Sequence, residues 1–276
     1  MTTATAPAKI NLALVVGPTR VDGKHAVATV LQRVDLADTL SVDAGPDLRV
    51  AGFEDDTLVA QALLALAEAA GTEPRWHVRI DKRIPVAAGL AGGSSDAAAG
   101  LRLANETLPE PLPPDRLSAL AATIGADVPF FLAPGTQLGT GDGTELERLD
   151  LPLDYRVVLL LPTGAVKAST AAVYEEFDRR NGSEGFEARG QALVDALRDV
   201  RTARDLATLP RNDLVSSPLA TELERRGAFR ADVSGAGPCL YGLFEREHEA
   251  RAAARELATL GAAWVCAPCR GTVDAP

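Results

Sequence analysis

The stretch Ile84–Gly100 reads IPVAAGLAGGSSDAAAG. It combines several glycines with two adjacent serines and then continues into strong helix formers. Glycine lets a backbone turn tightly and bring its N–H groups close to a ligand. A helix that begins near Ser94 would add unpaired N–H donors and the positive end of its dipole. The stretch therefore predicts an anion site whose natural guest is phosphate.

A plain glycine turn followed by a helix cap would give the same pattern, so both interpretations remain open on these residues alone. Asp96 adds to the ambiguity, because its carboxylate could compete with a ligand for the donors at the helix start. The spacing is not that of a P-loop, G-x-x-x-x-G-K-[ST], nor that of the dinucleotide fingerprint, G-x-G-x-x-G.

The composition is that of a soluble globular protein. The chain has 276 residues, of which 46% are hydrophobic and 24% charged, enough for one large domain or two. Its formal net charge of -10 argues against a nucleic-acid surface, which needs an excess of Lys and Arg. A nucleotide is still compatible, because a few N–H groups and one cation can hold its phosphates.

No segment suggests a leader or a membrane span. The first residues, MTTATAPAK, lack an apolar run, and the purest apolar run, VVLLLP, has the length of a strand. We therefore expect a cytoplasmic protein that binds no membrane. The three cysteines are Cys239, Cys266 and Cys269. The C-x-x-C pair is compatible with a metal or redox role, but it lacks a second pair or nearby histidines, so reduced buried thiols are favoured.

The first half of the chain mixes strands and helices. Residues Lys9–Val16 alternate, with apolar side chains on one face and Lys9 and Asn11 on the other. Residues 26–42 predict one or two strands broken at Asp38–Thr39. Caps and apolar stripes predict helices at 55–71, 94–105 and 115–125, and residues 141–150 are interpreted as an acidic turn between strands.

The second half continues this mixture. We expect helices at 170–180, 189–200, 218–226 and 247–260, and strands at 156–164, 231–235, 239–244 and 263–268. No strict βαβ rhythm or fixed-period repeat is present, so the predicted class is α+β with two domains, 1–153 and 154–276.

Five motifs in order give a more specific indication: PAKINL from Pro7, Asp22-Gly23-x-His25, the glycine-rich stretch, GADVPFF from Gly125, and SGAGP from Ser234. The set resembles the GHMP kinase superfamily of small-molecule kinases over nearly the whole chain. Within it, the motifs are most similar to kinases of the non-mevalonate isoprenoid pathway, whose acceptor is a cytidine diphosphate-linked methylerythritol. The resemblance implies an N-terminal domain like ribosomal protein S5 domain 2, a ferredoxin-like C-terminal domain, and an active site between them.

The resemblance also implies ATP with Mg²⁺ as cofactors. The residues that would hold the nucleotide are Pro85, Ala88, Gly89, Leu90, Ala91, Gly92, Gly93, Ser94 and Ser95, with Ser95 as a candidate Mg²⁺ contact. A loop from the other domain would close the site with Ser234, Gly235 and Gly237.

Two residues are expected to perform the chemistry. From the residues alone, Asp127 is a helix cap before Pro129 and Lys9 a solvated strand lysine. The resemblance implies that Asp127 is the catalytic aspartate, which accepts the proton of the acceptor hydroxyl, and that Lys9 is the cation beside the developing charge. Asn11, on the same strand face, would contact the acceptor.

The acceptor pocket is where the sequence departs from the family. His25, Thr170 and Tyr174 match substrate-side positions, although His25 is also compatible with a surface loop and Tyr174 with a helix core. Lys24 stands where the family has an aromatic residue that stacks on cytosine. This leaves open a kinase for another polyol, sugar or isoprenoid-precursor alcohol, and also a catalytically silent ligand sensor. The sequence is compatible with a monomer or a homodimer.

Overall fold

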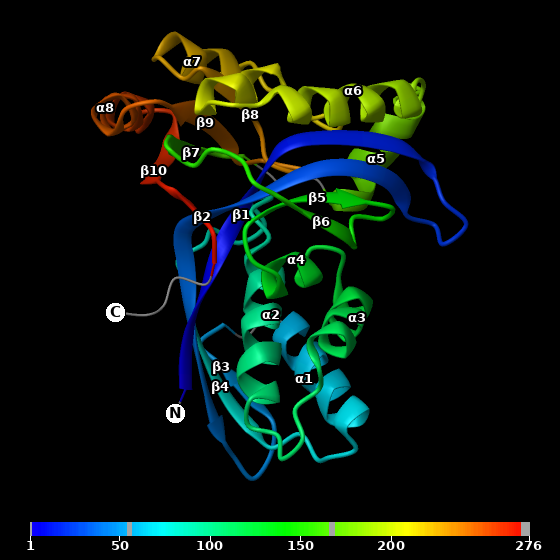
Figure 1. Cartoon of the computed structure of the whole chain (residues 1–276). Helices are drawn as coiled ribbons and strands as arrows, with labels where there is room; N and C mark the ends of the chain where they lie inside the picture. Colours follow the sequence, from blue (N-terminus) through cyan, green and yellow to red (C-terminus); the bar gives the residue numbers. More distant parts are fainter. Residues whose placement is uncertain (1, 54–56, 166–168, 272–276) are drawn as a thin grey trace.

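The computed structural model describes residues 2–53, 57–165 and 169–271, and these form two antiparallel-rich sheets with helices packed on them (Figure 1). The first sheet has seven strands and the second has four. Strands and helices are not in βαβ alternation, so the predicted α+β class is confirmed. Among the described residues, no helix has both the length and the apolar character needed to cross a bilayer.

A long hairpin organises the whole chain. Strand β1 (Thr2–Thr19) pairs antiparallel with β2 (His25–Ala44) along nearly their full length. The remaining strands of the first sheet extend from β2, in the order β3-β4-β2-β5-β6. Their bounds are Arg49–Ala51 for β3, Trp76–Asp81 for β4, Thr136–Thr140 for β5 and Glu145–Leu149 for β6.

The structure corrects two predictions about these strands. The predicted break at Asp38–Thr39 is wrong, because β2 is continuous there and Asp38 is a buried acceptor for the N–H groups of Arg83 and Ile84. The register instead shifts between Pro7 and Ala8 on β1. The predicted acidic turn at 141–150 is also too long, since residues 145–149 form β6.

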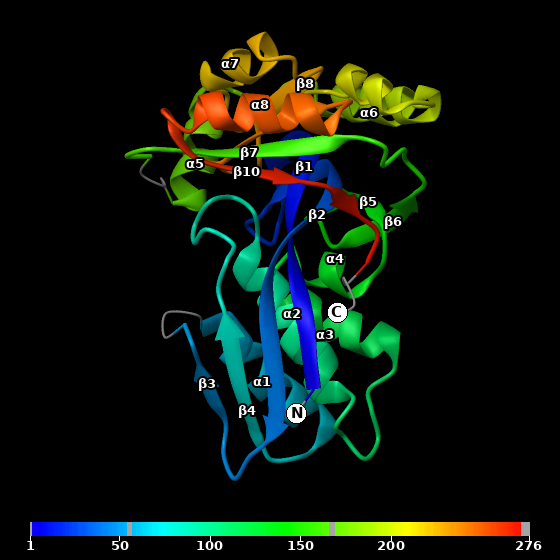
Figure 2. The ribbon, with the colours of Figure 1, turned by 90° about the vertical axis from the view of Figure 1, so that its left-hand side faces the viewer.

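Four helices cover one face of the first sheet (Figure 2). They are α1 (Thr57–Ala70), α2 (Gly92–Asn105), α3 (Pro114–Ile124) and α4 (Val128–Leu132). The predicted cap residues Asp55 and Asp56 of the first helix lie outside the described residues. Alanines on α2 are buried against β1, β2 and α1, which lets this helix approach the sheet closely and brings its N-terminus to the centre of the molecule.

The second sheet has the order β10-β7-β9-β8 and carries helices on its outer side. Its strands are β7 (Arg156–Pro162), β8 (Arg230–Val233), β9 (Leu240–Phe244) and β10 (Gly261–Cys266). The helices of this part are α5 (Thr170–Arg179), α6 (Phe186–Asp199), the 3₁₀ helix η1 (Ala203–Thr208), α7 (Leu219–Arg225) and α8 (Glu247–Leu257).

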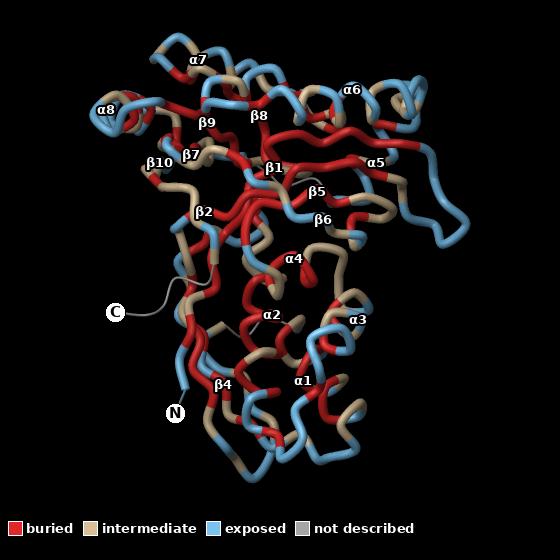
Figure 3. Tube along the Cα trace, in the orientation of Figure 1, coloured by how far each residue is buried: buried red, intermediate tan, exposed pale blue. Residues whose placement is uncertain are grey.

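The two sheets share one core around the hairpin. Ile10 and Leu12 of β1 belong to the same buried cluster as Tyr155 and Tyr241, and the strands at this crossing are buried throughout (Figure 3). Strand β11 (Pro268–Cys269) returns to the first sheet and pairs with β2. The predicted domain boundary at residue 153 falls between the strands of the two sheets, and the division into domains stays a prediction.

Candidate active site

A cavity of about 660 Å³ lies where β1, the glycine-rich loop, α5 and the 235–237 loop meet. Most of the residues predicted for the site line it. They are Lys9, Asn11, Pro85, Ala88, Gly89, Ala91, Gly92, Gly93, Ser94, Asp127, Thr170, Tyr174, Gly235 and Gly237. The structure therefore brings together side chains from both halves of the sequence.

Four predicted residues do not line this cavity: His25, Leu90, Ser95 and Ser234. Leu90 is buried, and its carbonyl accepts the N–H of Lys9 at 3.1 Å. Through this bond the glycine-rich loop is fixed to β1 beside the predicted catalytic lysine. Leu90 thus supports the site from behind.

The glycine-rich loop has an unusual backbone. Gly89 has φ +84°, and Ala87 and Ala91 also have positive φ, of 59° and 54°. Alanine adopts this left-handed region only at a cost, and such residues cluster at sites that bind ligands. The loop is therefore held in a conformation that its local sequence alone does not favour.

Helix α2 begins directly after this loop with free donors. Ala91 provides no side-chain cap, and the first intrahelical bond runs from the Ser95 N–H to the Ala91 carbonyl. The N–H groups of Gly92, Gly93 and Ser94 precede that bond, so they have no acceptor within the helix. Since all three residues line the cavity, the positive end of the helix dipole is directed at it.

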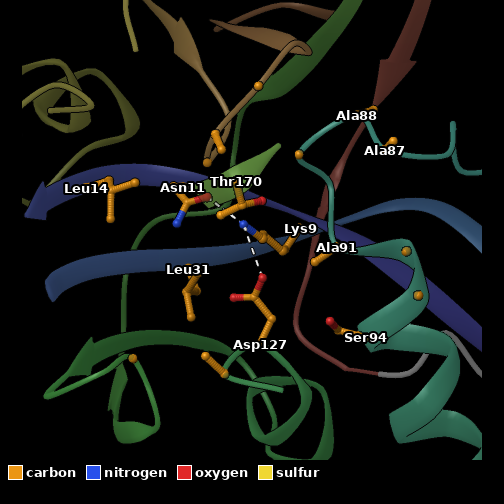
Figure 4. A pocket seen from close by; sticks show the side chains of 18 of the residues that line it. Lys9, Asn11, Leu14, Leu31, Ala87, Ala88, Ala91, Ser94, Asp127 and Thr170 are labelled. Carbon is orange, nitrogen blue, oxygen red and sulfur yellow. Dashed lines mark hydrogen bonds and ion pairs between the residues drawn. The ribbon is translucent and has the colours of Figure 1, made fainter. Parts of the chain in front are cut away.

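Ser95 differs from the prediction. Its hydroxyl donates to the carbonyl of Pro7 at 2.7 Å, and the residue is 1% exposed. A side chain buried in this way is directed into the β1 contact, so the expected Mg²⁺ contact of Ser95 is not supported. Ser94, one position earlier, lines the cavity instead (Figure 4).

A buried ion cluster lies under the loop. The Lys82 ammonium is 2.6 Å from a carboxylate oxygen of Asp38 and 2.6 Å from one of Asp96. Asp96 therefore pairs with a lysine beneath the loop. Burial alone would lower the pKa of Lys82, but the two carboxylates outweigh it and raise that pKa.

Lys9 is the central cation of the cavity. Its ammonium is 2.7 Å from Asn11 Oδ1 and 3.7 Å from Asp127 Oδ2, and its side chain is 5% exposed (Figure 4). The Asn11 amide also donates to Thr29 Oγ1 at 2.8 Å. Both ends of this amide are thus occupied, so the geometry favours a role of Asn11 in holding Lys9.

Asp127 lies at the start of the short helix α4, yet its carboxylate makes no capping bond there. Its side chain is 38% exposed and faces the cavity next to Lys9. The cap interpretation is therefore not supported, and the carboxylate remains accessible to a ligand.

The 234–238 loop closes the site from the second sheet. The Ser234 hydroxyl donates to the Gly89 carbonyl at 3.0 Å, and the Cys239 N–H donates to the Ala88 carbonyl at 3.0 Å. A Cβ on Gly235 would lie 3.4 Å from the Lys9 ammonium nitrogen. This loop therefore packs directly against both the glycine-rich loop and Lys9.

The far end of the cavity is apolar and aromatic. Leu14, Val27, Leu214 and Tyr174 line it and belong to or pack against one buried cluster. The pKa of Tyr174 is raised to about 12, first by burial and then by the nearby Asp127 carboxylate. His25 lies beside this end, with its ring 4.6 Å from that of Tyr174 and its Nε2 2.9 Å from Asp178 Oδ1.

Two charged residues of the cavity, Lys82 and Asp142, were not predicted from the sequence. Lys82 lies three positions before Pro85. Its proximity to the glycine-rich stretch is the only sequence signal that points to a role in the site. Asp142 was included only as part of an acidic turn, although the flanking Gly141 and Gly143 indicate a tight bend that exposes one carboxylate. It lines the cavity and is 2.6 Å from the ammonium of Lys24.

The cysteines lie outside the cavity. Burial raises the pKa of Cys239 and Cys266 to about 12 and that of Cys269 to about 11, so these thiols are poor nucleophiles. All three are free, and no group of three or more His, Cys, Asp or Glu within the described ranges could hold a metal ion. Cys239 and Cys266 are buried, as predicted, whereas Cys269 is only partly buried.

Comparisons with known proteins agree with this architecture. Residues 57–135 match the model of the GHMP kinases N terminal domain, and residues 215–263 match that of the GHMP kinases C terminal region. The chain is 40% identical to the 4-diphosphocytidyl-2-C-methyl-D-erythritol kinase of Nocardia farcinica (strain IFM 10152), over 94% of this chain and 90% of that protein. It is also 40% identical to the kinase of the same name from Rhodococcus jostii (strain RHA1), over 95% and 88%.

Two solved structures have a fold similar to that of this chain over nearly its full length. A crystal structure of 4-(cytidine 5'-diphospho)-2C-methyl-D-erythritol kinase aligns with a TM-score of 0.79 at 31% identity, covering 98% of this chain and all (100%) of that one. A mevalonate kinase aligns with a TM-score of 0.75 at 15% identity, over 98% and 100%, which shows a shared fold.

Proposed function

This chain belongs to the 4-diphosphocytidyl-2-C-methyl-D-erythritol kinase family of the GHMP kinases, and we propose that it transfers a phosphoryl group from ATP to a hydroxyl of 4-diphosphocytidyl-2-C-methyl-D-erythritol. One observation carries the proposal: the Lys9–Asp127 pair faces the same cavity as the open N-terminus of α2. Phosphoryl transfer to an alcohol requires a phosphate site, a carboxylate that orients the alcohol and a cation near the developing charge.

The glycine-rich loop suits the phosphates of ATP. The N–H groups of Gly92, Gly93 and Ser94 are free of helical acceptors and line the cavity, which supports a role as the phosphate cradle. Gly89 also needs to lack a side chain, since a Cβ on it would lie 2.3 Å from the Ser234 carbonyl oxygen. The nucleotide would supply the phosphoryl group, and these donors would hold it in line with the acceptor.

Asp127 is proposed as the group that accepts the proton of the attacking hydroxyl. Its accessible carboxylate supports this role, because a general base must come within hydrogen-bond reach of the proton that it removes. Lys9 would keep Asp127 oriented and would stabilise negative charge as it develops on the transferred group. Asn11 would hold Lys9 in place.

The residues present fit Mg²⁺ as a nucleotide-bound ion. No cluster of three acidic or imidazole ligands occurs in the described part of the chain. Mg²⁺ in kinase sites keeps several waters and binds mainly to substrate phosphates plus one or two protein groups. Ser94, whose side chain lines the cavity, is the residue that we propose near this ion.

Thr170, Tyr174 and His25 are proposed on the acceptor side. Thr170 and Tyr174 line the cavity, and the ring of His25 lies 4.6 Å from that of Tyr174. A flat cytosine ring would find an aromatic surface there.

The resemblance places an aromatic residue at the position of Lys24, and this departure favours a second candidate, a GHMP kinase for a different alcohol. A catalytically silent sensor is less well supported, since both Lys9 and Asp127 are retained in contact. The cytoplasmic location, the monomer or homodimer state and the absence of nucleic-acid binding stay predictions.

A coupled ADP-release assay tests the proposal. We expect turnover with the cytidylated acceptor and Mg²⁺-ATP, and none with uncytidylated methylerythritol phosphate. Preferential phosphorylation of mevalonate, homoserine or a sugar would instead support the second candidate. An absence of ADP release with every acceptor would favour the silent sensor.

A further inference from the structure

An ion pair spans two turns at the acceptor end of the cavity. Lys24, before β2, and Asp142, in the β5–β6 turn, are 118 positions apart, yet their side chains meet at 2.6 Å. The Lys24 side chain is 50% exposed, whereas that of Asp142 is 13% exposed. The pair therefore lies at the rim, with the carboxylate turned inward.

The Asp142 carboxylate is held rigidly. Its Oδ1 accepts the Thr144 hydroxyl at 2.6 Å, and the flanking Gly141 and Gly143 have φ of +68° and +101°. Gly141 also accepts the N–H of Val27 at 2.9 Å, which fixes the turn to β2. A bound partner would therefore meet a carboxylate in a defined position.

The surroundings favour a flat ring with one polar edge. Next to Asp142, a Cβ on Gly143 would lie 3.6 Å from Val27 Cγ2 and 4.0 Å from Ala126 Cβ, so both side chains are close to this turn. Leu14, Leu214 and Tyr174 complete this end of the cavity. An apolar and aromatic pocket with the Asp142 carboxylate at its edge matches a heteroaromatic ring that carries an amine.

The chemistry of the pair distinguishes the pyrimidines. An ionised carboxylate only accepts hydrogen bonds, and a lysine ammonium only donates them. Cytosine carries an exocyclic amine that donates, next to a ring nitrogen that accepts, and Asp is a known acceptor for that amine. Uracil has a carbonyl in place of the amine. A carbonyl and a carboxylate both only accept hydrogen bonds, so these two groups would repel each other.

We infer that Lys24 and Asp142 determine the specificity for the base: Asp142 accepts from the exocyclic amine of cytosine, and Lys24 donates to the adjacent acceptors of the ring. This inference rests on the proposed function, because it concerns the acceptor of that same site. Asp142 is suited to the task over a wide pH range. Although its partial burial opposes ionisation, hydrogen bonds from Lys24 and Thr144 and the Lys24 charge lower its pKa to about 2.

Binding of CDP and UDP, measured by calorimetry with a saturating non-hydrolysable ATP analogue present, tests the inference. The wild-type protein should bind CDP about 10- to 100-fold more tightly than UDP, since a good polar contact to a base edge is worth about 1–3 kcal/mol of discrimination. In Asp142→Asn the preference should fall below about threefold, because the amide can also donate to the uracil carbonyl. Lys24→Met, which keeps the stem and removes the donor, should weaken CDP binding more than UDP binding.

Asp47→Asn is the matched control. Asp47 is an exposed carboxylate paired with Arg49 and His77, and it does not line the cavity, so this variant should keep the wild-type preference. Equal affinity of the wild type for CDP and UDP would overturn the inference. So would an equal loss for both ligands in the Asp142 and Lys24 variants, which would indicate contacts with the shared diphosphate. A protein that prefers CDP but phosphorylates no cytidylated alcohol would contradict the proposed function and leave this inference standing.

Discussion

Gly89 and Ser234 are packed so closely that no side chain fits between them. A Cβ on Gly89 would lie 2.3 Å from the Ser234 carbonyl oxygen, and the Ser234 hydroxyl donates to the Gly89 carbonyl. These residues belong to the two loops that approach the cavity from different sheets. Their contact holds the phosphate side of the site in register with the loop beside Lys9.

We expect Gly89→Ala to disrupt this contact. The added methyl group clashes with backbone, and alanine is strained at a φ of +84°. Turnover should fall by about 10²-fold or more, as expected for a misplaced catalytic group, and the melting temperature should also fall. Gly71→Ala is the control, because Gly71 has φ +63° with open space around it and shares only the strain. Equal effects of the two substitutions on turnover would refute the packing argument.

Ser94 and Ser95 should respond differently to loss of the hydroxyl. Ser95→Ala removes a buried bond to the Pro7 carbonyl, so it should lower the free energy of unfolding by about 1–3 kcal/mol with little change in the KM for ATP. Ser94→Ala should lower kcat/KM for ATP about 10-fold or more, because a hydrogen bond to a charged group is worth about 1.5–3 kcal/mol. Steady-state kinetics and chemical denaturation of both variants test this. A loss of stability in Ser94→Ala together with a loss of kcat/KM for ATP in Ser95→Ala would contradict the assignment.

Lys82→Met should destabilise the fold more than most substitutions. It leaves the buried carboxylates of Asp38 and Asp96 without their common cation, and breaking a buried ion pair in this way costs about 3–5 kcal/mol. Lys24→Met removes an ion pair of the same length at an exposed position and should change the free energy of unfolding by less than about 1 kcal/mol. Similar denaturation midpoints for the two variants would contradict the structural role of Lys82.

The stabilisation by Lys82 should depend on pH only in the alkaline range. The folded state raises the pKa of Lys82 above its ordinary value of 10.5, so the folded state binds this proton more tightly than the unfolded chain does. The contribution is therefore fully present below about pH 10.5 and is lost as the pH rises through the folded-state pKa. Urea denaturation from pH 8 to pH 11.5 should show the wild type converging on Lys82→Met at the upper end. A constant difference across this range would count against the assignment.

The fold and much of the site could be predicted from local patterns. The helix predicted from Ser94, which in the structure begins two residues earlier at Gly92, and the alternation along β1 carry their own physical signals, because a glycine turn and a period of two need no tertiary information. The predicted helix at 170–180 matches α5, Thr170–Arg179, to within one residue. The α+β class followed from these signals, whereas the kinase family followed from the resemblance of the five motifs to a known family.

The remaining features depend on partners that are distant in sequence. Asp38 resembles a turn residue until Lys82 and the N–H groups of Arg83 and Ile84 are seen around it. Ser95 resembles Ser94 until its bond to Pro7 is known. The meeting of Lys24 with Asp142 depends on how the hairpin and the β5–β6 turn fold together, which no local pattern specifies.

The proposed general base is Asp127, which is held beside Lys9 and would remove the proton of the acceptor hydroxyl. Single-turnover kinetics of Asp127→Asn, with saturating ATP and cytidylated acceptor, measure this step. Asp115→Asn, which changes an acidic residue in the first turn of α3, serves as the control. We predict that Asp127→Asn reduces the rate of phosphoryl transfer by about 10²–10⁴ while nucleotide affinity and melting temperature stay near the wild-type values. A rate within a few-fold of the wild type would contradict the account.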